Sequence, residues 1–302
     1  MLSFLPAPIR GLLAFLVMAL NTIISVVPLL FITLLKLIIP IKSWGKLCVW
    51  LLIKIAENWM SVNSFALSLS GRIQIDLRGA EGLHYHGWYL VSCNHQSWSD
   101  ILILQQVFNR RIPMLKFFLK QELIWVPLMG VAWWALDFPF MKRYSKDFLE
   151  KHPEMKGKDL ETTRKACEKF KELPVSVMNF LEGTRFTQAK HDAQGSPYQN
   201  LLKPKSGGIA FVLSAMGGQL RSMLDVTIVY HDEAIGFWDL LCGRVRHLTV
   251  QIVERPIPEQ FGCGDYENDT AFRAEFQEWV NQLWQEKDAL ITSIKQESTF
   301  GN

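Results

Sequence analysis

The feature that most constrains this chain is an uncharged apolar stretch near its N-terminus. No charged residue occurs from Gly11 to Leu35, a run of 25 residues in a chain of 302. About 20 apolar residues are enough to cross a bilayer as a helix. The run is too long for the apolar part of a secretory signal, and no small-x-small cleavage site follows a short apolar core. A buried core helix is the alternative, but such helices seldom stay uncharged over this length.

Polar residues within this N-terminal region allow more than one arrangement of its helices. Asn21, Thr22 and Pro28 interrupt the run, so two short helices dipping into one leaflet are an alternative to a single spanning helix. A second apolar piece, from Leu47 to Ile53, is too short to span a bilayer. Tryptophans and lysines surround it, which is typical of an interfacial segment.

Charge indicates which side of the membrane the rest of the chain occupies. Only Arg10 precedes the apolar run, whereas Lys36, Lys42, Lys46 and Lys54 follow it. The positive-inside tendency then places the C-terminal side in the cytoplasm. We therefore expect residues 1–70 to form membrane-anchoring helices, in the cytoplasmic membrane if the protein is bacterial. Residues 71–302 would form a second domain that faces the cytoplasm.

Composition excludes several other classes of protein. The formal net charge of +3 gives no polycationic character that would favour nucleic acid as a partner. The five cysteines are scattered and form no C-x-x-C pair, so no metal site is expected.

Downstream of the anchor, strand patterns alternate with helical patterns, which predicts an α/β fold. Strands are expected at 72–77, 88–93, 114–118, 175–181, 225–230 and 247–253, and helices at 101–108, from 207 to 216, and at 270–294. Charges of both signs are dense from 142 to 172, which indicates one or two solvated helices.

The first candidate catalytic motif contains a histidine at the end of a predicted buried strand. His95 stands where the backbone turns into a helix, and Asp100 follows about one helical turn later. A carboxylate that holds one imidazole nitrogen fixes the tautomer, so the other nitrogen can take a proton from a hydroxyl. The alternative is a satisfied loop histidine, with Asp100 only favouring the helix N-terminus. Ser97 and Ser99 are available to cap that helix.

The second candidate functional motif follows the predicted strand at 175–181. That strand ends in Glu182-Gly183-Thr184-Arg185. A glycine turn exposes backbone N–H groups, and an adjacent arginine can form two hydrogen bonds to a phosphate or carboxylate. Arg143 directly follows an apolar, strand-like segment, where a guanidinium could stand at the rim of a pocket.

Three motifs occur in this order: the N-H-x4-D turn, the strand that leads to Arg143, and the F-x-E-G-T-R strand end. Together they resemble the glycerolipid acyltransferase family. They are most similar to the 1-acylglycerol-3-phosphate (lysophosphatidic acid) acyltransferases. The resemblance covers residues 72–253 and the hydrophobic N-terminal segment. It implies an α/β fold with a mixed sheet on an N-terminal hydrophobic helical membrane-binding motif.

The same resemblance implies the reaction and its partners. A fatty acyl group would move from acyl-CoA or acyl-carrier protein, as co-substrate, to 1-acylglycerol 3-phosphate, giving phosphatidic acid. The partners would be a lysophospholipid acceptor, an acyl thioester donor and membrane lipids, without nucleic acid, metal or a tightly bound cofactor. A membrane lipid hydrolase and a non-enzymatic lipid-binding protein are the rivals. No G-x-S-x-G motif supports the hydrolase.

The resemblance also implies residue roles. His95 would be the general base on the acceptor hydroxyl, and Asp100 would orient it. The acceptor phosphate would be bound by Arg143, Glu182, Gly183, Thr184 and Arg185.

Two departures from the family pattern bear on the acceptor. Leu181 stands where the family usually has proline, and the segment from 226 to 229 lacks the usual proline. They make the headgroup the open point, with lysophosphatidylglycerol and lysocardiolipin as the alternative acceptors.

Overall fold

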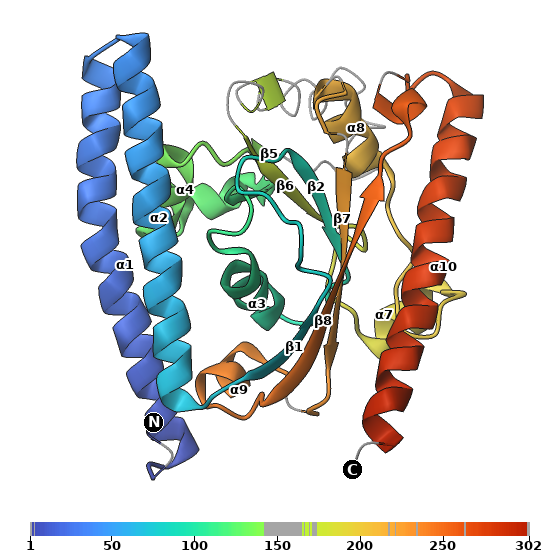
Figure 1. Ribbon diagram of the computed structural model, residues 1–302, viewed down its shortest axis with the longest axis horizontal. Helices are drawn as coiled ribbons and strands as arrows, with labels where there is room; N and C mark the ends of the chain where they lie inside the picture. Colours follow the sequence, from blue (N-terminus) through green and yellow to red (C-terminus); the bar gives the residue numbers. More distant parts are fainter. Residues whose placement is uncertain are drawn as a thin grey trace.

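The computed structural model describes the chain except for residues 1, 3, 142–164, 166, 169, 171–173, 217, 221, 234, 263, 301 and 302. The chain begins with two long helices, α1 (Ala7–Ile38) and α2 (Lys42–Ser70), which pack side by side as a hairpin (Figure 1). α1 is one continuous helix with Pro28 inside it, so the arrangement of two short helices does not form.

The polar residues of α1 explain why the helix continues through them. The Asn21 side chain donates hydrogen bonds to the Asn63 side-chain oxygen at 2.9 Å and to the Trp59 carbonyl oxygen at 3.0 Å. The indole N–H of Trp59 donates to the Thr22 hydroxyl at 2.9 Å. These residues therefore hold α1 to α2 and do not end the helix.

Most of α1 is not covered by the rest of the protein. Large apolar side chains such as Val27 and Phe31 are 66% and 60% exposed. Among the residues that the structure describes, α1 is the one helix that is long and apolar enough to cross a membrane. Its exposure is inconsistent with the alternative of a buried core helix.

A six-stranded mixed sheet forms the centre of the remaining chain. Its strands are β1 (Gln74–Arg78), β2 (Tyr89–Cys93), β3 (Leu115–Phe117), β6 (Ser176–Phe180), β7 (Ser222–Tyr230) and β8 (His247–Pro256). Their order is β1-β8-β7-β2-β6-β3, and every pair is parallel except β7 with β8. A separate pair joins β4 (Leu119–Lys120) to β5 (Phe140–Met141). The predicted α/β class, mixed sheet and six strands are confirmed, with strand ends within three residues of those expected.

Helices cover both faces of the sheet (Figure 1). The face toward the hairpin carries α3 (Ser99–Phe108), η1 (Gln121–Trp125), α4 (Met129–Ala135) and α9 (Phe237–Leu241). The other face carries α7 (Gln188–Gln194), α8 (Gly207–Met216), η3 (Glu259–Gly262) and α10 (Thr270–Phe300).

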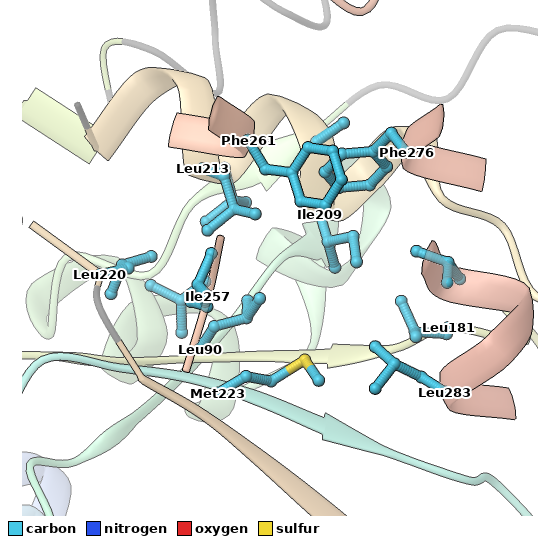
Figure 2. Packing of buried hydrophobic residues seen from close by; sticks show 14 of the residues in the cluster. Leu90, Leu181, Ile209, Leu213, Leu220, Met223, Ile257, Phe261, Phe276 and Leu283 are labelled. Atoms are coloured by element: carbon cyan, nitrogen blue, oxygen red, sulfur yellow. The ribbon is translucent and has the colours of Figure 1, made fainter. Parts of the chain in front are cut away.

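Figure 2 shows part of the core between the sheet and the α8–α10 side. Leu90 and Met223 come from the central strands, Leu213 from α8, and Phe276 and Leu283 from α10. Strand β2 lies inside the sheet, and all five of its residues are buried.

This topology determines where the polar motifs meet. β2, β6 and β7 are parallel neighbours, so their carboxyl ends lie at the same edge of the sheet. His95 follows β2, Glu182 follows β6, and Tyr230 ends β7. Ligands of open α/β sheets bind at such carboxyl ends. The fold therefore brings together two sequence motifs that are almost ninety residues apart.

Candidate active site

His95 and Asp100 contact each other at the turn between β2 and α3. The Nδ1 atom of His95 lies 2.8 Å from the Oδ2 atom of Asp100. The imidazole also stacks on Phe180, the last residue of β6, with ring centroids 3.9 Å apart and planes inclined by 15°. No hydrogen bond to the other ring nitrogen, Nε2, comes from the part of the chain that the structure describes. The carboxylate and the phenyl ring thus fix the imidazole and leave Nε2 for a ligand.

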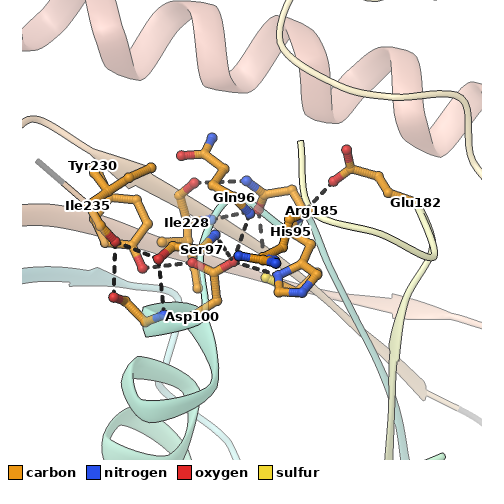
Figure 3. Close-up of polar contacts among 12 residues, drawn as sticks. His95, Gln96, Ser97, Asp100, Glu182, Arg185, Ile228, Tyr230 and Ile235 are labelled. Atoms are coloured by element: carbon orange, nitrogen blue, oxygen red, sulfur yellow. Dashed lines mark hydrogen bonds and ion pairs between the residues drawn. The ribbon is translucent and has the colours of Figure 1, made fainter. Parts of the chain in front are cut away.

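Asp100 is fully buried and is held on both carboxylate oxygens (Figure 3). Its Oδ2 atom accepts the backbone N–H groups of Gln96 at 2.7 Å and Ser97 at 2.9 Å. Its Oδ1 atom accepts the hydroxyl of Tyr230 at 2.7 Å. An ionised carboxylate with this many donors accepts the Nδ1–H of the histidine, which leaves Nε2 unprotonated and able to act as a base.

The loop around His95 is fixed to the neighbouring β7 and to the segment after it. The Asn94 side chain exchanges hydrogen bonds of 2.9 Å with both the carbonyl oxygen and the N–H of Ile228. The hydroxyls of Ser97 and Ser99 both donate to the carbonyl oxygen of Ile235, and both serines are buried. Neither serine is placed as a nucleophile for His95, which disfavours the hydrolase alternative. The expected serine cap is confirmed for Ser97, because its hydroxyl accepts the N–H of Ser99, the first residue of α3, at 3.1 Å, although Trp98 occupies the N-cap position.

Glu182 is buried and bonded to the loop that carries His95. The residue is fully buried, and its two carboxylate oxygens accept the backbone N–H groups of His95 at 2.7 Å and Leu202 at 3.0 Å. Burial raises the pKa of Glu182 to about 7. The carboxylate of Glu182 thus holds the backbone of the His95 loop. The expected contact between Glu182 and the acceptor phosphate stays a prediction.

Gly183 and Thr184 form the turn after β6. Gly183 has φ +67°, a left-handed conformation that favours glycine, and the space that a Cβ atom would take is 3.1 Å from the Lys205 side chain. The hydroxyl of Thr184 accepts a hydrogen bond of 2.8 Å from the Lys190 ammonium. The turn is thus lined by two lysines.

Arg185 is exposed next to this turn and beside His95 (Figure 3). Its guanidinium lies over the ring of Trp98, 4.9 Å from the ring centroid. The side chain is held at the start of α3, while its N–H groups stay available to an anion. Arg143 lies outside the described residues.

Sequence reasoning missed two residues of this site, Tyr230 and Lys190. Tyr230 was recognised only as the end of a strand, whereas β7 continues four residues past the end of β2, where Cys93 pairs with Val226, and so carries Tyr230 over the His95 turn. Lys190 comes from a segment whose path across the site is set by tertiary packing. Lys205 belongs to residues 203–208, a segment that the sequence already offers as a possible anion site at the start of a helix, and it lies beside the Gly183 turn. Among the described residues, no group of three or more His, Cys, Asp and Glu side chains is placed to hold a metal ion.

Comparisons with known proteins agree with this geometry. A family model described as Acyltransferase matches residues 74–231, which is more than half of the chain. The gamma and delta 1-acyl-sn-glycerol-3-phosphate acyltransferases of Homo sapiens are each 25% identical over 196 residues, covering 61% of this chain and 47% of the relative. The chain thus spans about half the length of these curated relatives.

A solved structure has the same fold. The crystal structure of the 1-acyl-sn-glycerophosphate (LPA) acyltransferase PlsC from Thermotoga maritima aligns with a TM-score of 0.57 at 18% identity, covering 95% of this chain and 98% of that one. The match to the family model spans both the His95–Asp100 turn and the Glu182–Arg185 turn. The chain belongs to the acyltransferase family.

Proposed function

We propose that the protein transfers a fatty acyl group from acyl-CoA or acyl-carrier protein to the free hydroxyl of 1-acylglycerol 3-phosphate, giving phosphatidic acid. One observation carries the proposal. The imidazole of His95 is oriented by the buried Asp100 through a contact of 2.8 Å, and its Nε2 atom is free of other described groups. This is the arrangement of a general base without a neighbouring protein nucleophile.

The reaction needs only this base and the two substrates. Nε2 of His95 takes the proton of the acceptor hydroxyl as its oxygen attacks the thioester carbonyl carbon. The C–S bond then breaks, and the departing thiolate takes the proton back from the imidazolium. Asp100 stabilises the transient positive charge on His95, as carboxylates do in other oriented histidine bases.

Cationic groups beside the base support an anionic acceptor. Arg185 is exposed next to His95, and Lys190 and Lys205 flank the turn at Gly183 and Thr184. Arginine forms paired hydrogen bonds with phosphate oxygens, and lysines add positive charge. The distant relatives named above act on 1-acyl-sn-glycerol 3-phosphate, which supports that acceptor first. Lysophosphatidylglycerol and lysocardiolipin are the alternative acceptors.

An apolar pocket supports a fatty acyl substrate. It lies between the hairpin, α3 and α4, and its lining includes Ala56, Trp59, Leu115 and Ala132. Leu115 belongs to β3, whose Phe117 stacks on Phe180 beneath the His95 ring. We assign this pocket to the acyl chain, and the exposed apolar surface of α1 to the membrane from which lipid substrates enter.

The decisive experiment is an acyltransfer assay with a matched histidine control. Membranes that contain the protein are given labelled acyl-CoA with lysophosphatidic acid, lysophosphatidylglycerol or lysocardiolipin. A general base typically contributes ~10²–10⁴ in rate, so His95→Ala should lose at least a hundredfold of the activity. His86→Ala, a change at an exposed histidine, should leave it unchanged.

The acceptor that gives the most diacyl product identifies the headgroup. Free fatty acid released without any acceptor would support a hydrolase instead. Lipid binding without turnover, equal in the parent and His95→Ala, would support a binding protein.

A further inference from the structure

An exposed apolar stripe lies on η1 and α4, away from the candidate active site. Trp125, Leu128, Val131 and Trp134 follow one another at a spacing of three residues, and they are 84%, 42%, 42% and 48% exposed. We call these four side chains the α4 stripe. Large apolar side chains normally turn toward the core of a helical segment, and the surface stays polar. Here four large apolar side chains are exposed instead.

The fully buried residues of α4 are small, whereas its half-buried Met129 and Trp133 line the apolar pocket. Ala132 and Ala135 are buried and pack with Val26 and Leu29 of α1 and Leu52 of α2. The segment is therefore tightly docked, and its outward face is not a consequence of loose packing. The same helix lines the apolar pocket from within through Ala132. α4 is thus a thin wall between that pocket and the outside.

The stripe continues the exposed apolar surface of α1. Figure 1 shows α4 beside the hairpin, and α4 packs against α1. Lys36 near the end of α1 pairs with Asp137 just after α4 at 3.1 Å, so the two segments end together at a polar boundary. Along α1, Val27 and Phe31 expose most of their side chains.

We infer that the α4 stripe is a second membrane contact, seated in the interface of a lipid bilayer beside α1. No charged residue occurs from Leu123 to Leu136, a segment of 14 residues. It is too short to span a bilayer but is suited to lie in one leaflet. Tryptophan side chains are enriched at the level of the lipid headgroups, and the stripe carries one at each end. Two adjacent contacts, α1 and the stripe, would fix how the protein is oriented on the membrane.

Site-specific labelling tests this inference in the full-length protein. Val131→Cys and Trp125→Cys are labelled with an environment-sensitive fluorophore and reconstituted into phosphatidylcholine–phosphatidylglycerol vesicles. Ala274→Cys, an exposed position on α10, is the matched control. The native cysteines in the described part of the chain are buried, and the unsubstituted protein provides the labelling blank.

Fluorophores at positions 125 and 131 should be quenched by spin-labelled lipids and protected from aqueous iodide, with the reverse at position 274. Equal iodide quenching at all three positions would overturn the inference. Protection that increases with the protein-to-lipid ratio, without quenching by spin-labelled lipids, would assign the stripe to a second copy of the chain and also overturn it. The vesicles contain no acyl donor or acceptor, so the outcome is independent of whether the proposed reaction occurs.

Discussion

Asp100 shows how a single residue can be prepared for its role by its surroundings. The side chain has no exposure, and its oxygens are taken by two backbone N–H groups, one tyrosine hydroxyl and the His95 ring. Buried carboxylates are stable only when their hydrogen-bonding capacity is used in this way. The backbone donors come from the loop itself, whereas Tyr230 comes from β7. Tyr230 is therefore the side chain that ties the orientation of Asp100 to the sheet.

Replacing Tyr230 with phenylalanine removes one hydrogen bond and leaves the ring in place. A hydrogen bond to a charged group contributes ~1.5–3 kcal/mol, and each 1.36 kcal/mol in the barrier is tenfold in rate. We expect kcat to fall roughly tenfold while KM for the acceptor changes little, because Tyr230 does not reach the cationic turn. Steady-state kinetics of Tyr230→Phe against the parent measure this split. A raised KM with an unchanged kcat would contradict a positioning role.

Glu182 predicts a pH dependence of stability. Its pKa is raised by burial to about 7 from an ordinary value of 4.5. The folded protein therefore holds this proton more tightly than the unfolded chain does. The stabilisation is fully present below about pH 4.5 and is lost as the pH rises through about 7, a change on the order of 3 kcal/mol. Glu182→Gln cannot titrate, so its free energy of unfolding should lack this component.

The measurement is chemical unfolding of both proteins in detergent at pH 4.5, 7 and 8.5. The free energy of unfolding of the parent, minus that of Glu182→Gln, should be most favourable to the parent at the lowest pH. A difference between the two proteins that does not change with pH would show that Glu182 titrates normally in the folded state.

Helices and strands could be predicted from the sequence wherever a local residue pattern determines the secondary structure. The β2 strand and the α3 helix follow from apolar patterning on either side of His95, and Asp100 in the first turn of α3 is close enough to reach back to the turn that carries His95. The hydrogen bonds of Glu182 could not be predicted, because its partners, the N–H groups of His95 and Leu202, lie in distant segments. The outward face of α4 could not be predicted either, since periodicity gives the spacing of a stripe and not which side the protein covers.

The pocket between the hairpin and α4 predicts acyl-chain selectivity. Ala56 on α2 is buried and lines this pocket, so Ala56→Leu should fill part of it. Burial of one CH2 group is worth ~0.8 kcal/mol, or roughly fourfold in relative kcat/KM for each methylene that no longer fits. Competition between acyl-CoA donors of different length should therefore shift toward shorter chains. Ala274→Leu, at an exposed position of α10, should show no shift. An unchanged length profile in Ala56→Leu would place the acyl chain elsewhere.

In the whole molecule, the two faces of the sheet are covered by helices of different character. One side carries the exposed apolar hairpin, and the other is covered by α10, a helix of 31 residues (Figure 1). A buried ion pair connects α10 to the sheet. The ammonium of Lys287 lies 2.6 Å from the Asp225 carboxylate and donates to the Val226 carbonyl oxygen at 2.6 Å. Asp225 belongs to β7, the strand that ends at Tyr230, and Lys287 belongs to α10, so the pair joins α10 to the strand that supports the active site.

Lys287→Met should therefore destabilise the whole α/β unit. Removing one partner of a buried pair leaves the other charge poorly compensated and typically costs about 3–5 kcal/mol. Asp225 retains Arg255 at 3.1 Å, which places the expected loss at the lower end of that range. The matched control is Arg78→Met, which breaks an exposed ion pair between β1 and Glu297 of the same helix and should change stability by about 0–1 kcal/mol. If α10 only strengthened the surface, both variants would unfold like the parent. If it completes the core behind β7, Lys287→Met alone should lower the unfolding midpoint, and Tyr230 and Asp100 should lose their ordered environment in the same transition.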